Sequence, residues 1–452
     1  MIKPTSPYSA FVFDSYRHDP ATGEVLLTYK FENGPEFTER LVIPPSGRVL
    51  SEEEGRALDR ALFALHLAAG VSYYKAYCPN NVIVNSGALS KGEADFWTTL
   101  YTHGLGEFFY RNDLDFTGLI HFPVSEVVRS HHPQPLLGEE GRKNQGALVP
   151  IGGGKDSLMS IGKLLTAQKS FSLFTFGQHE RLDQMAQMLR LPQLAVERFV
   201  DPQLIALKGQ PGVYNGHVPI TAILATTAVT AAIIHGNADV IFSNERSANV
   251  GNVVMNGMEI NHQYSKSLAF ERALSNYIKQ SISPNIRVFS LLRPFSELAI
   301  VQEFVKAGKY FDAITSCNRS FRIVKDGTEQ RWCGECPKCA FVFALFAAFV
   351  PTESLRQIFG RNFFEHADLV PTYQALVGKK MKPFECVGEP EEVIVALAMA
   401  HERGELEDTA VMKWFVAQVL PSVSDLEAMK TRVFTPSADH LVPSEYLSII
   451  GL

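Results

Sequence analysis

With 452 residues, the chain is too long to fold around one compact core, so we expect two or three domains. Its composition, 46% apolar and 20% charged, is that of a globular protein and excludes a disordered or fibrous one. The 48 acidic residues outnumber the 42 basic ones, and the net charge of −6 argues against a protein whose main task is to bind nucleic acid.

The sequence gives no sign of a membrane segment. The N-terminus lacks the charged and then apolar organisation of a signal peptide. The two longest apolar stretches, 220–234 and 340–350, are shorter than the ~20 residues that span a bilayer. We therefore expect a cytoplasmic protein that does not bind membranes.

Residues 1–140 predict an N-terminal α+β domain. Apolar and polar side chains alternate between residues 8 and 45, which is typical of an antiparallel meander. Ser51 followed three positions later by Glu54 forms a capping box, which predicts the start of a long helix. A stretch rich in Pro and Gly at 133–146 indicates a linker.

From residue 141 to about 300, predicted strands and helices alternate. This rhythm predicts an α/β domain with a parallel sheet and helices on both faces. The remaining residues, 301–452, predict a helical C-terminal region. The five predicted strands are 147–151, 172–176, 194–200, 239–243 and 286–290.

The first of these strands runs into a glycine-rich turn, Gly152-Gly153-Gly154-Lys155-Asp156-Ser157. Backbone without side chains lets N–H groups approach an anion, and the following helix points its positive end at the same place. Lys155 adds a cation, Ser157 a hydroxyl, and Asp156 a carboxylate that could hold Mg²⁺. The turn has neither the Walker nor the dinucleotide-binding spacing. A turn without a ligand is the plain alternative, but its place at a strand's carboxyl end favours a phosphate site.

A cysteine cluster follows the predicted sheet. Cys333, Cys336 and Cys339 have the spacing of a metal knuckle, and Cys317 is close enough in sequence to be a fourth ligand. Four thiolates are the ligand set of a structural zinc site, which leaves no open position for catalysis. Spacing alone does not exclude an iron–sulfur cluster, so both metals stay open at this point.

Two polar runs are further candidates for site residues. The run 243–247 contains Glu245 and Arg246 and follows the fourth predicted strand. The run 259–267 contains His262 and Lys266 and precedes a helix. Solvated loops without a function are an equal alternative for both runs.

Three isolated residues complete the candidates. His217 lies at a predicted helix start, where it could meet a ligand or cap the helix. Arg293 ends the fifth strand and suits a phosphate contact. Cys386, in the C-terminal region, could be a thiol acid or base, although a single cysteine is more often a small buried apolar residue.

The glycine-rich turn resembles the PP-loop of ATP pyrophosphatases, whose usual form is Ser-Gly-Gly-x-Asp-Ser. The match covers Gly153, Gly154, Asp156 and Ser157, whereas Gly152 replaces the serine. The resemblance implies an adenine-nucleotide (HUP, PP-loop-like) fold and cleavage of ATP, with Mg²⁺, to AMP and diphosphate. The cysteine cluster is similar to the zinc knuckle of PP-loop enzymes of deazaguanine biosynthesis, which favours zinc.

Taken together, these motifs and the run Lys382-Pro-Phe-Glu-Cys386 resemble the MurL-type UDP-N-acetylmuramoyl-L-alanyl-L-glutamate epimerases over nearly the whole chain. The resemblance implies ATP-dependent inversion of the terminal L-Glu of the UDP-N-acetylmuramoyl dipeptide, in peptidoglycan biosynthesis. We take Gly152–Ser157 and Arg293 as the nucleotide-binding candidates, and the cysteines as zinc ligands. The catalytic candidates are Lys155, Asp156, Glu245, Arg246, His217, His262 and Lys266, with the proton-transfer pair among the last three.

Two alternatives stay open at this stage. One is a PP-loop enzyme that amidates or thiolates a nucleobase or a tRNA, although the acidic net charge argues against tRNA. The other is a nucleotide-sensing protein that binds ATP without cleaving it. The sequence does not give the oligomeric state.

Overall fold

The computed structural model describes residues 1–452 except 126–145, 309, 318 and 320–330. The chain begins with the expected antiparallel meander. Along β2 every second side chain is buried, from Val25 to Phe31, so one face of the meander is the core face. The first strands are β1 (Ala10–Asp19), β2 (Glu24–Phe31) and β3 (Glu36–Val42).

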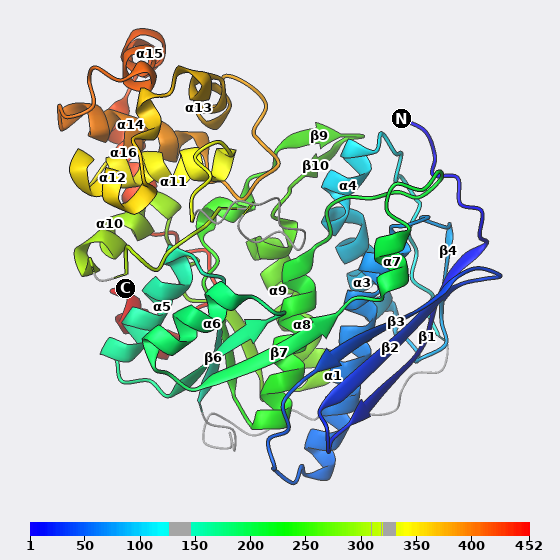
Figure 1. Cartoon of the computed structure of the whole chain (residues 1–452). Coiled ribbons are helices and arrows are strands. Elements are labelled where there is room, and N and C mark those ends of the chain that lie inside the picture. The colour runs from blue at the N-terminus through cyan, green and yellow to red at the C-terminus, as the bar shows by residue number, and fades with distance from the viewer. Residues whose placement is uncertain (126–145, 309, 318, 320–330) are drawn as a thin grey trace.

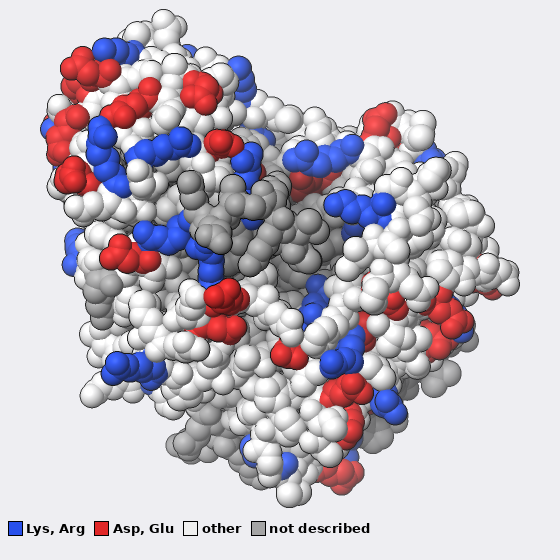
Figure 2. Space-filling model, viewed as in Figure 1, with Lys and Arg blue, Asp and Glu red and all other residues white. Residues whose placement is uncertain are grey.

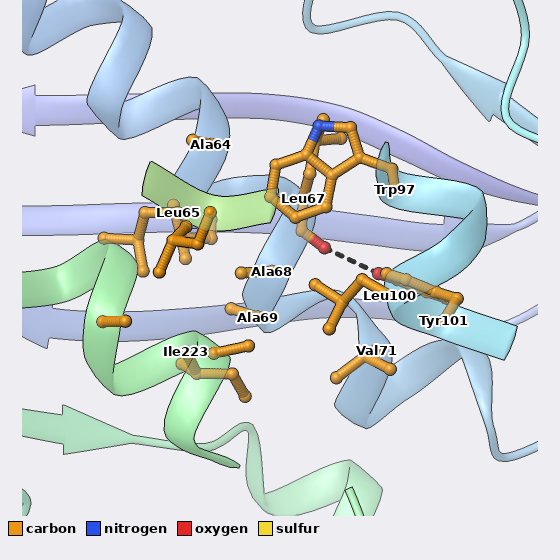
Figure 3. Packing of buried hydrophobic residues seen from close by; sticks show 14 of the residues in the cluster. Ala64, Leu65, Leu67, Ala68, Ala69, Val71, Trp97, Leu100, Tyr101 and Ile223 are labelled. Carbon is orange, nitrogen blue, oxygen red and sulfur yellow. Dashed lines mark hydrogen bonds between the residues drawn. The ribbon is translucent and has the colours of Figure 1, made fainter. Parts of the chain in front are cut away.

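Helix α1 (Glu52–Ala69) covers this core face, and its capping box is present as predicted. The Ser51 hydroxyl accepts the Glu54 N–H at 3.2 Å, and the Glu54 carboxylate accepts the Ser51 N–H at 2.8 Å. Figure 3 shows Leu67, Ala68 and Ala69 of α1 between α3 (Lys91–Gly104) and α8 (Ile220–His235). Tyr101 of α3 donates its hydroxyl proton to the Leu67 carbonyl at 2.6 Å.

The five predicted strands of the central region are all present and parallel, which confirms the α/β rhythm. Their spatial order is β11-β8-β5-β6-β7. The central strands β5 and β8 are buried on both faces, as strands of a parallel sheet are, whereas β7 alternates buried and exposed side chains. Their bounds are β5 (Ala147–Pro150), β6 (Phe171–Phe176), β7 (Gln193–Phe199), β8 (Asp239–Phe242) and β11 (Arg287–Ser290).

The meander and the parallel strands form one sheet of nine strands. β3 pairs with β7 in antiparallel register, with Val42 opposite Glu197, and β4 (Asn81–Val84) closes the far edge beside β1. Figure 1 shows this sheet running from the meander into the central strands. The expected division near residue 140 therefore does not interrupt the sheet, and α1 packs along α8 across it.

Helices cover both faces of the central strands. Leu148 points into the core shared with α1 and α8, whereas its neighbours Ala147 and Val149 point into the core shared with α5 and α17. This alternation follows from the two-residue period of a strand. The helices named here and below are α5 (Lys155–Thr166), α6 (Glu180–Leu189), α9 (Leu268–Tyr277), α10 (Glu297–Ala307) and α17 (Ser444–Ile450).

The C-terminal region is the expected helical lobe, and it lies beyond α5 and α10 in Figure 1. Its centre is α11, which is buried all round and accounts for the apolar stretch at 340–350. Among the described residues, none of the helices combines the length and apolar character needed to cross a bilayer. The lobe contains α11 (Pro337–Ala347), α12 (Thr352–Phe359), α13 (Val370–Leu376), α14 (Pro390–Glu402), α15 (Ala410–Gln418) and α16 (Leu426–Phe434).

Candidate active site

The strand order makes the carboxyl ends of β5 and β8 the expected place for a ligand. Numbered along the chain, the five parallel strands have the spatial order third, second, first, fourth, fifth, so the direction of winding reverses between β5 and β8. Doubly wound sheets bind ligands at the carboxyl ends of the strands at this switch point. Gly152–Gly154 follow β5, and the run 243–247 follows β8. Two candidate segments from the sequence therefore meet at one edge of the sheet.

The glycine-rich turn has the backbone geometry of an anion cradle. Gly153 has φ of 78°, a left-handed conformation that favours glycine, and its carbonyl accepts the Thr315 N–H at 3.0 Å. A Cβ on Gly154, the N-cap of α5, would lie 3.1 Å from the Ser316 hydroxyl. Gly152 is exposed, with open space where a Cβ would lie. The turn is thus covered on one side by residues 315–316 and open at Gly152, with the positive end of α5 behind it.

Lys155 lies at the centre of a buried charge network. Its ammonium is 2.7 Å from the Asp156 carboxylate and 2.6 Å from that of Glu297 on α10. Lys338 of α11 approaches the same Glu297 carboxylate at 3.2 Å. Burial alone would raise the pKa of Glu297, but Lys155 and Lys338 outweigh it and hold this pKa at about 2. Burial opposes the charge of Lys155 too, yet Asp156 and Glu297 raise its pKa.

Glu245 and Asp156 are the other carboxylates at this edge. Glu245 is buried, and burial followed by the negative charges of Glu297 and Asp156 raises its pKa to about 7. The Asp156 side chain is a quarter exposed. Near neutral pH, Glu245 therefore exchanges a proton easily, whereas Asp156 is the carboxylate that a cation from solvent can reach.

The two arginine candidates face the protein, not a ligand. Arg293 is fully buried and donates to the carbonyls of Glu245 and Lys266, both at 2.6 Å, and to the Glu271 carboxylate at 2.7 Å. A buried guanidinium needs acceptors for its five N–H groups, and these partners supply them. In place of the expected phosphate contact, Arg293 fixes the backbone of two other candidates. Arg246 donates to the carbonyls of Arg432 and Val433 in the last turn of α16 and to that of Thr435, which follows the helix.

A second polar cluster gathers around Glu107 of α4 (Gly106–Arg111), which the sequence did not mark. The Glu107 carboxylate lies 2.5 Å from His262 Nδ1, 3.6 Å from His217 Nδ1 and 2.5 Å from Arg111 Nε. The two imidazole rings are 4.5 Å apart. The structure therefore brings His217 and His262 together on one buried carboxylate.

The two histidines differ in charge. Burial and the positive charge of His262 lower the pKa of His217 to about 3. Burial alone would also lower the pKa of His262, but hydrogen bonds with Cys386 and Glu107 outweigh it and raise this pKa to about 9. At neutral pH the pair thus consists of one imidazole and one imidazolium, an acceptor next to a donor.

Lys266 connects the two clusters. Its ammonium lies 3.3 Å from the Cys386 sulfur. Cys386 first, and also Glu245, raise the pKa of Lys266 against the effect of burial. Glu245 also interacts with Asp156 of the glycine turn, so Lys266 and Glu245 link the turn electrostatically to Cys386.

The four clustered cysteines have the geometry of a tetrahedral metal site. All are buried and free, and their sulfur atoms lie within 4.8 Å of one another. Cys333 and Cys339 are 3.7 Å apart, and a tetrahedron with Zn–S bonds of 2.3 Å has edges of about 3.8 Å. The N–H groups of Cys336 and Glu335 point at the Cys333 sulfur. This arrangement suits one metal ion.

The space-filling view adds the surroundings of these groups. On the face seen in Figure 2, Lys and Arg side chains, with some Asp and Glu among them, lie where the helical lobe and the sheet region face each other. A separate cavity between α1, α3 and α9, lined by Arg56, Phe96 and Tyr277 among others, contains none of the expected site residues. We therefore take the switch point between β5 and β8 as the candidate site.

The fold and site define a class: a doubly wound α/β protein with a glycine-rich turn at the switch point and a helical lobe that contains a cysteine cluster. The comparisons with known proteins then identify the family. The MurL N-terminal domain matches residues 3–291, and the MurL C-terminal domain matches residues 313–430. The chain belongs to the MurL family.

Three relatives agree along nearly the whole chain. A protein of Xanthomonas oryzae pv. oryzae is 39% identical over 436 residues, which are 96% of this chain and 95% of the relative. Proteins of Salinispora tropica and a Micromonospora species are 36% and 37% identical over 449 residues, 98% of this chain and 95% and 98% of the relatives. Each relative is named UDP-N-acetyl-alpha-D-muramoyl-L-alanyl-L-glutamate epimerase. An epimerase is an enzyme of the isomerase class.

Proposed function

We propose that the protein epimerises the terminal L-Glu of UDP-N-acetylmuramoyl-L-alanyl-L-glutamate to D-Glu, with cleavage of ATP to AMP and diphosphate. Its relatives' shared name supplies the substrate and the class of reaction. One observation supports the proposal: Glu245 interacts electrostatically with Asp156 of the glycine turn and with Lys266, and Lys266 in turn lies beside Cys386 of the second cluster. The central strands would then form a PP-loop-like nucleotide fold.

The chemistry explains why both parts are needed. A free carboxylate is a poor activator of its α-hydrogen, because deprotonation puts a second negative charge beside the first. Transfer of AMP to the carboxylate gives a mixed anhydride, whose carbonyl can take up the carbanion charge as an enolate. A positioned base then removes the hydrogen, and an acid returns one to the opposite face. Hydrolysis of the anhydride releases AMP and the product.

The residues of the cradle fit the first half of this reaction. The N–H groups of the glycine turn and the positive end of α5 would hold the leaving diphosphate. Lys155, held in its charged form by Glu297, adds positive charge behind the turn. Asp156 would be a ligand of Mg²⁺, since this ion prefers carboxylate oxygens. When bound, Mg²⁺ neutralises the charge that develops on the phosphate oxygens.

The cysteines fit a structural zinc ion, as their sulfur separations indicate. Since all four positions would be occupied by protein, the ion supplies stability and no chemistry. Cys317 is two residues from Thr315, whose N–H contacts the glycine turn. The zinc site would therefore fix the segment that covers the cradle.

The test is incubation with ATP, Mg²⁺ and the UDP-N-acetylmuramoyl dipeptide in D₂O. We expect AMP, D-Glu after acid hydrolysis, and deuterium at the glutamate α-carbon, and we expect Asp156→Ala to form no AMP. Epimerisation without AMP would contradict the ATP-dependent route. AMP with a new nitrogen or sulfur substituent would indicate the amidating or thiolating alternative, and ATP binding without AMP the sensor.

A further inference from the structure

The segment between α13 and α14, residues 377–389, connects the helical lobe to the rest of the protein. Lys382 donates to the Val250 carbonyl at 3.0 Å, and Asn252 donates to the Pro383 carbonyl at 2.6 Å. The Phe384 ring packs against that of Tyr110 with 5.1 Å between centroids. In Figure 1 this connection runs from α13 toward β9 (Val253–Met255) and β10 (Met258–Ile260). These contacts fix the three residues 382–384, which lie just before Cys386, against the strand region.

The sulfur of Cys386 lies between two cations. The Lys266 ammonium is 3.3 Å away, and His262 is the second group that lowers the pKa of this thiol. Because His262 Nδ1 contacts Glu107, its other ring nitrogen is the one left for the sulfur. Cys386 is only partly buried as a residue, whereas the other five cysteines are buried.

These neighbours set the charge of the thiol. Burial would raise the pKa of Cys386, but Lys266, His262 and the more distant Lys338 lower it to about 5. Cys78 is the contrast within the same chain, since burial raises the pKa of that thiol and its SH group donates to the Lys75 carbonyl. A cysteine that only fills space in the apolar core would have surroundings like those of Cys78. Cys386 instead has the surroundings of a nucleophile or a base.

A metal site at the histidines would be a different explanation. Glu107, His217 and His262 offer three possible ligand atoms within 4.8 Å of one another. A tetrahedral ion bound at ~2.1 Å would hold its ligand atoms about 3.4 Å apart. His262 Nδ1 and the Glu107 carboxylate are 2.5 Å apart, the distance of a short direct hydrogen bond. The geometry therefore favours an ion pair that orients His262 toward Cys386.

We propose that the Cys386 thiolate is the base that removes the α-hydrogen of the terminal glutamyl residue, with Lys266 and His262 as its positioning residues. This inference rests on the proposed epimerase function. The C–H bond breaks, an S–H bond forms, and the electron pair passes into the enolate of the adenylated carboxyl. A group on the opposite face returns a proton to the α-carbon. Water then cleaves the acyl–phosphate bond, AMP leaves, and the thiol loses its proton to solvent.

The first experiment separates the two half-reactions. In Cys386→Ala and Cys386→Ser, we expect epimerisation and α-deuterium incorporation to fall at least ~100-fold, the scale of general-base catalysis. Diphosphate release in a single turnover should continue, because it precedes the proton transfer, and it also shows that the variant is folded. Lys380→Ala, an exposed position of the same segment, is the control and should epimerise as the unchanged protein does.

The second experiment tests the thiolate without the reaction. Iodoacetamide at pH 6.5, with peptide mapping, should alkylate Cys386 well before Cys78, and Lys266→Met should slow the alkylation of Cys386. Epimerisation by Cys386→Ala at the unchanged rate, or equal alkylation of the two thiols, would overturn the inference while leaving the epimerase function intact. If the unchanged protein itself forms neither AMP nor D-Glu, the proposed function fails, and that outcome is recognisable on its own.

Discussion

Thr315 donates its backbone N–H to the carbonyl of Gly153 at 3.0 Å, only two residues before the cysteine ligand candidate Cys317. The segment that covers the glycine turn is therefore fixed at one end by the turn and at the other by the cysteine cluster. A metal ion bound by the cysteines would therefore be coupled to the glycine turn through residues 315–317 of the backbone.

This coupling predicts an effect of metal removal. We expect one zinc ion per chain by elemental analysis, and its removal by a chelator should lower the melting temperature and the rate of AMP formation together, because both depend on residues 315–317. Cys339→Ser should lose the metal, whereas Cys78→Ser, which changes a thiol outside the cluster, should keep it. Iron with acid-labile sulfide in place of zinc would contradict the structural zinc site.

Glu297→Gln tests the buried charge network. Removing this carboxylate leaves Lys338 and Lys155 short of their common partner, and we expect a loss of about 3 kcal/mol in the free energy of unfolding. Glu303→Gln, an exposed position on the same helix, should change it by less than ~0.5 kcal/mol. Urea titrations measure both.

The same carboxylate predicts a pH effect on stability. The pKa of Glu297 is about 2 in the folded chain, whereas a glutamate in the unfolded chain has its ordinary pKa of 4.5. Its contribution is therefore fully present above pH 4.5 and is lost as the pH falls toward 2. The difference in unfolding free energy between the unchanged protein and Glu297→Gln should shrink over that range. A constant difference from pH 7 to pH 3 would contradict the assigned ion pairs.

Arg293→Lys tests whether this residue positions the site or binds phosphate. Lysine keeps the charge but not the planar fork that holds the Glu245 and Lys266 carbonyls and Glu271. We expect a lower melting temperature and a lower kcat, with the dissociation constant for ATP changed less than about threefold. If ATP binding weakened by ~10-fold, about 1.4 kcal/mol, without a change in melting temperature, Arg293 would instead contact phosphate, as the sequence predicted.

The sequence predicts those parts of the site that depend on residues close together along the chain. The five parallel strands and the glycine turn were predictable because each depends on an apolar run followed directly by a turn signal. Glu107 was not marked, and Cys386 stayed open between a thiol acid or base and a buried apolar residue, since their partner His262 is 155 residues from Glu107 and lies on another element. Arg293 shows the same limit. The place of Arg293 at a strand end suggests a ligand contact. Only the position of Glu271 on α9 shows that the guanidinium points into the protein.

The acid–base cluster predicts the pH dependence of the reaction. The pKa of Cys386 is about 5 and that of His262 about 9, so kcat/KM should rise through an acid limb near the first value and fall through a basic limb near the second. Because the two groups are hydrogen bonded, these limbs belong to the pair. Glu107→Gln removes the carboxylate that stabilises protonated His262, so its basic limb should move to lower pH, while Asp95→Asn on the exposed face of α3 leaves the profile in place. A basic limb that stays where it is in Glu107→Gln would show that His262 does not titrate in the reaction, because the loss of a contact at 2.5 Å must change the pKa of an imidazolium that depends on it.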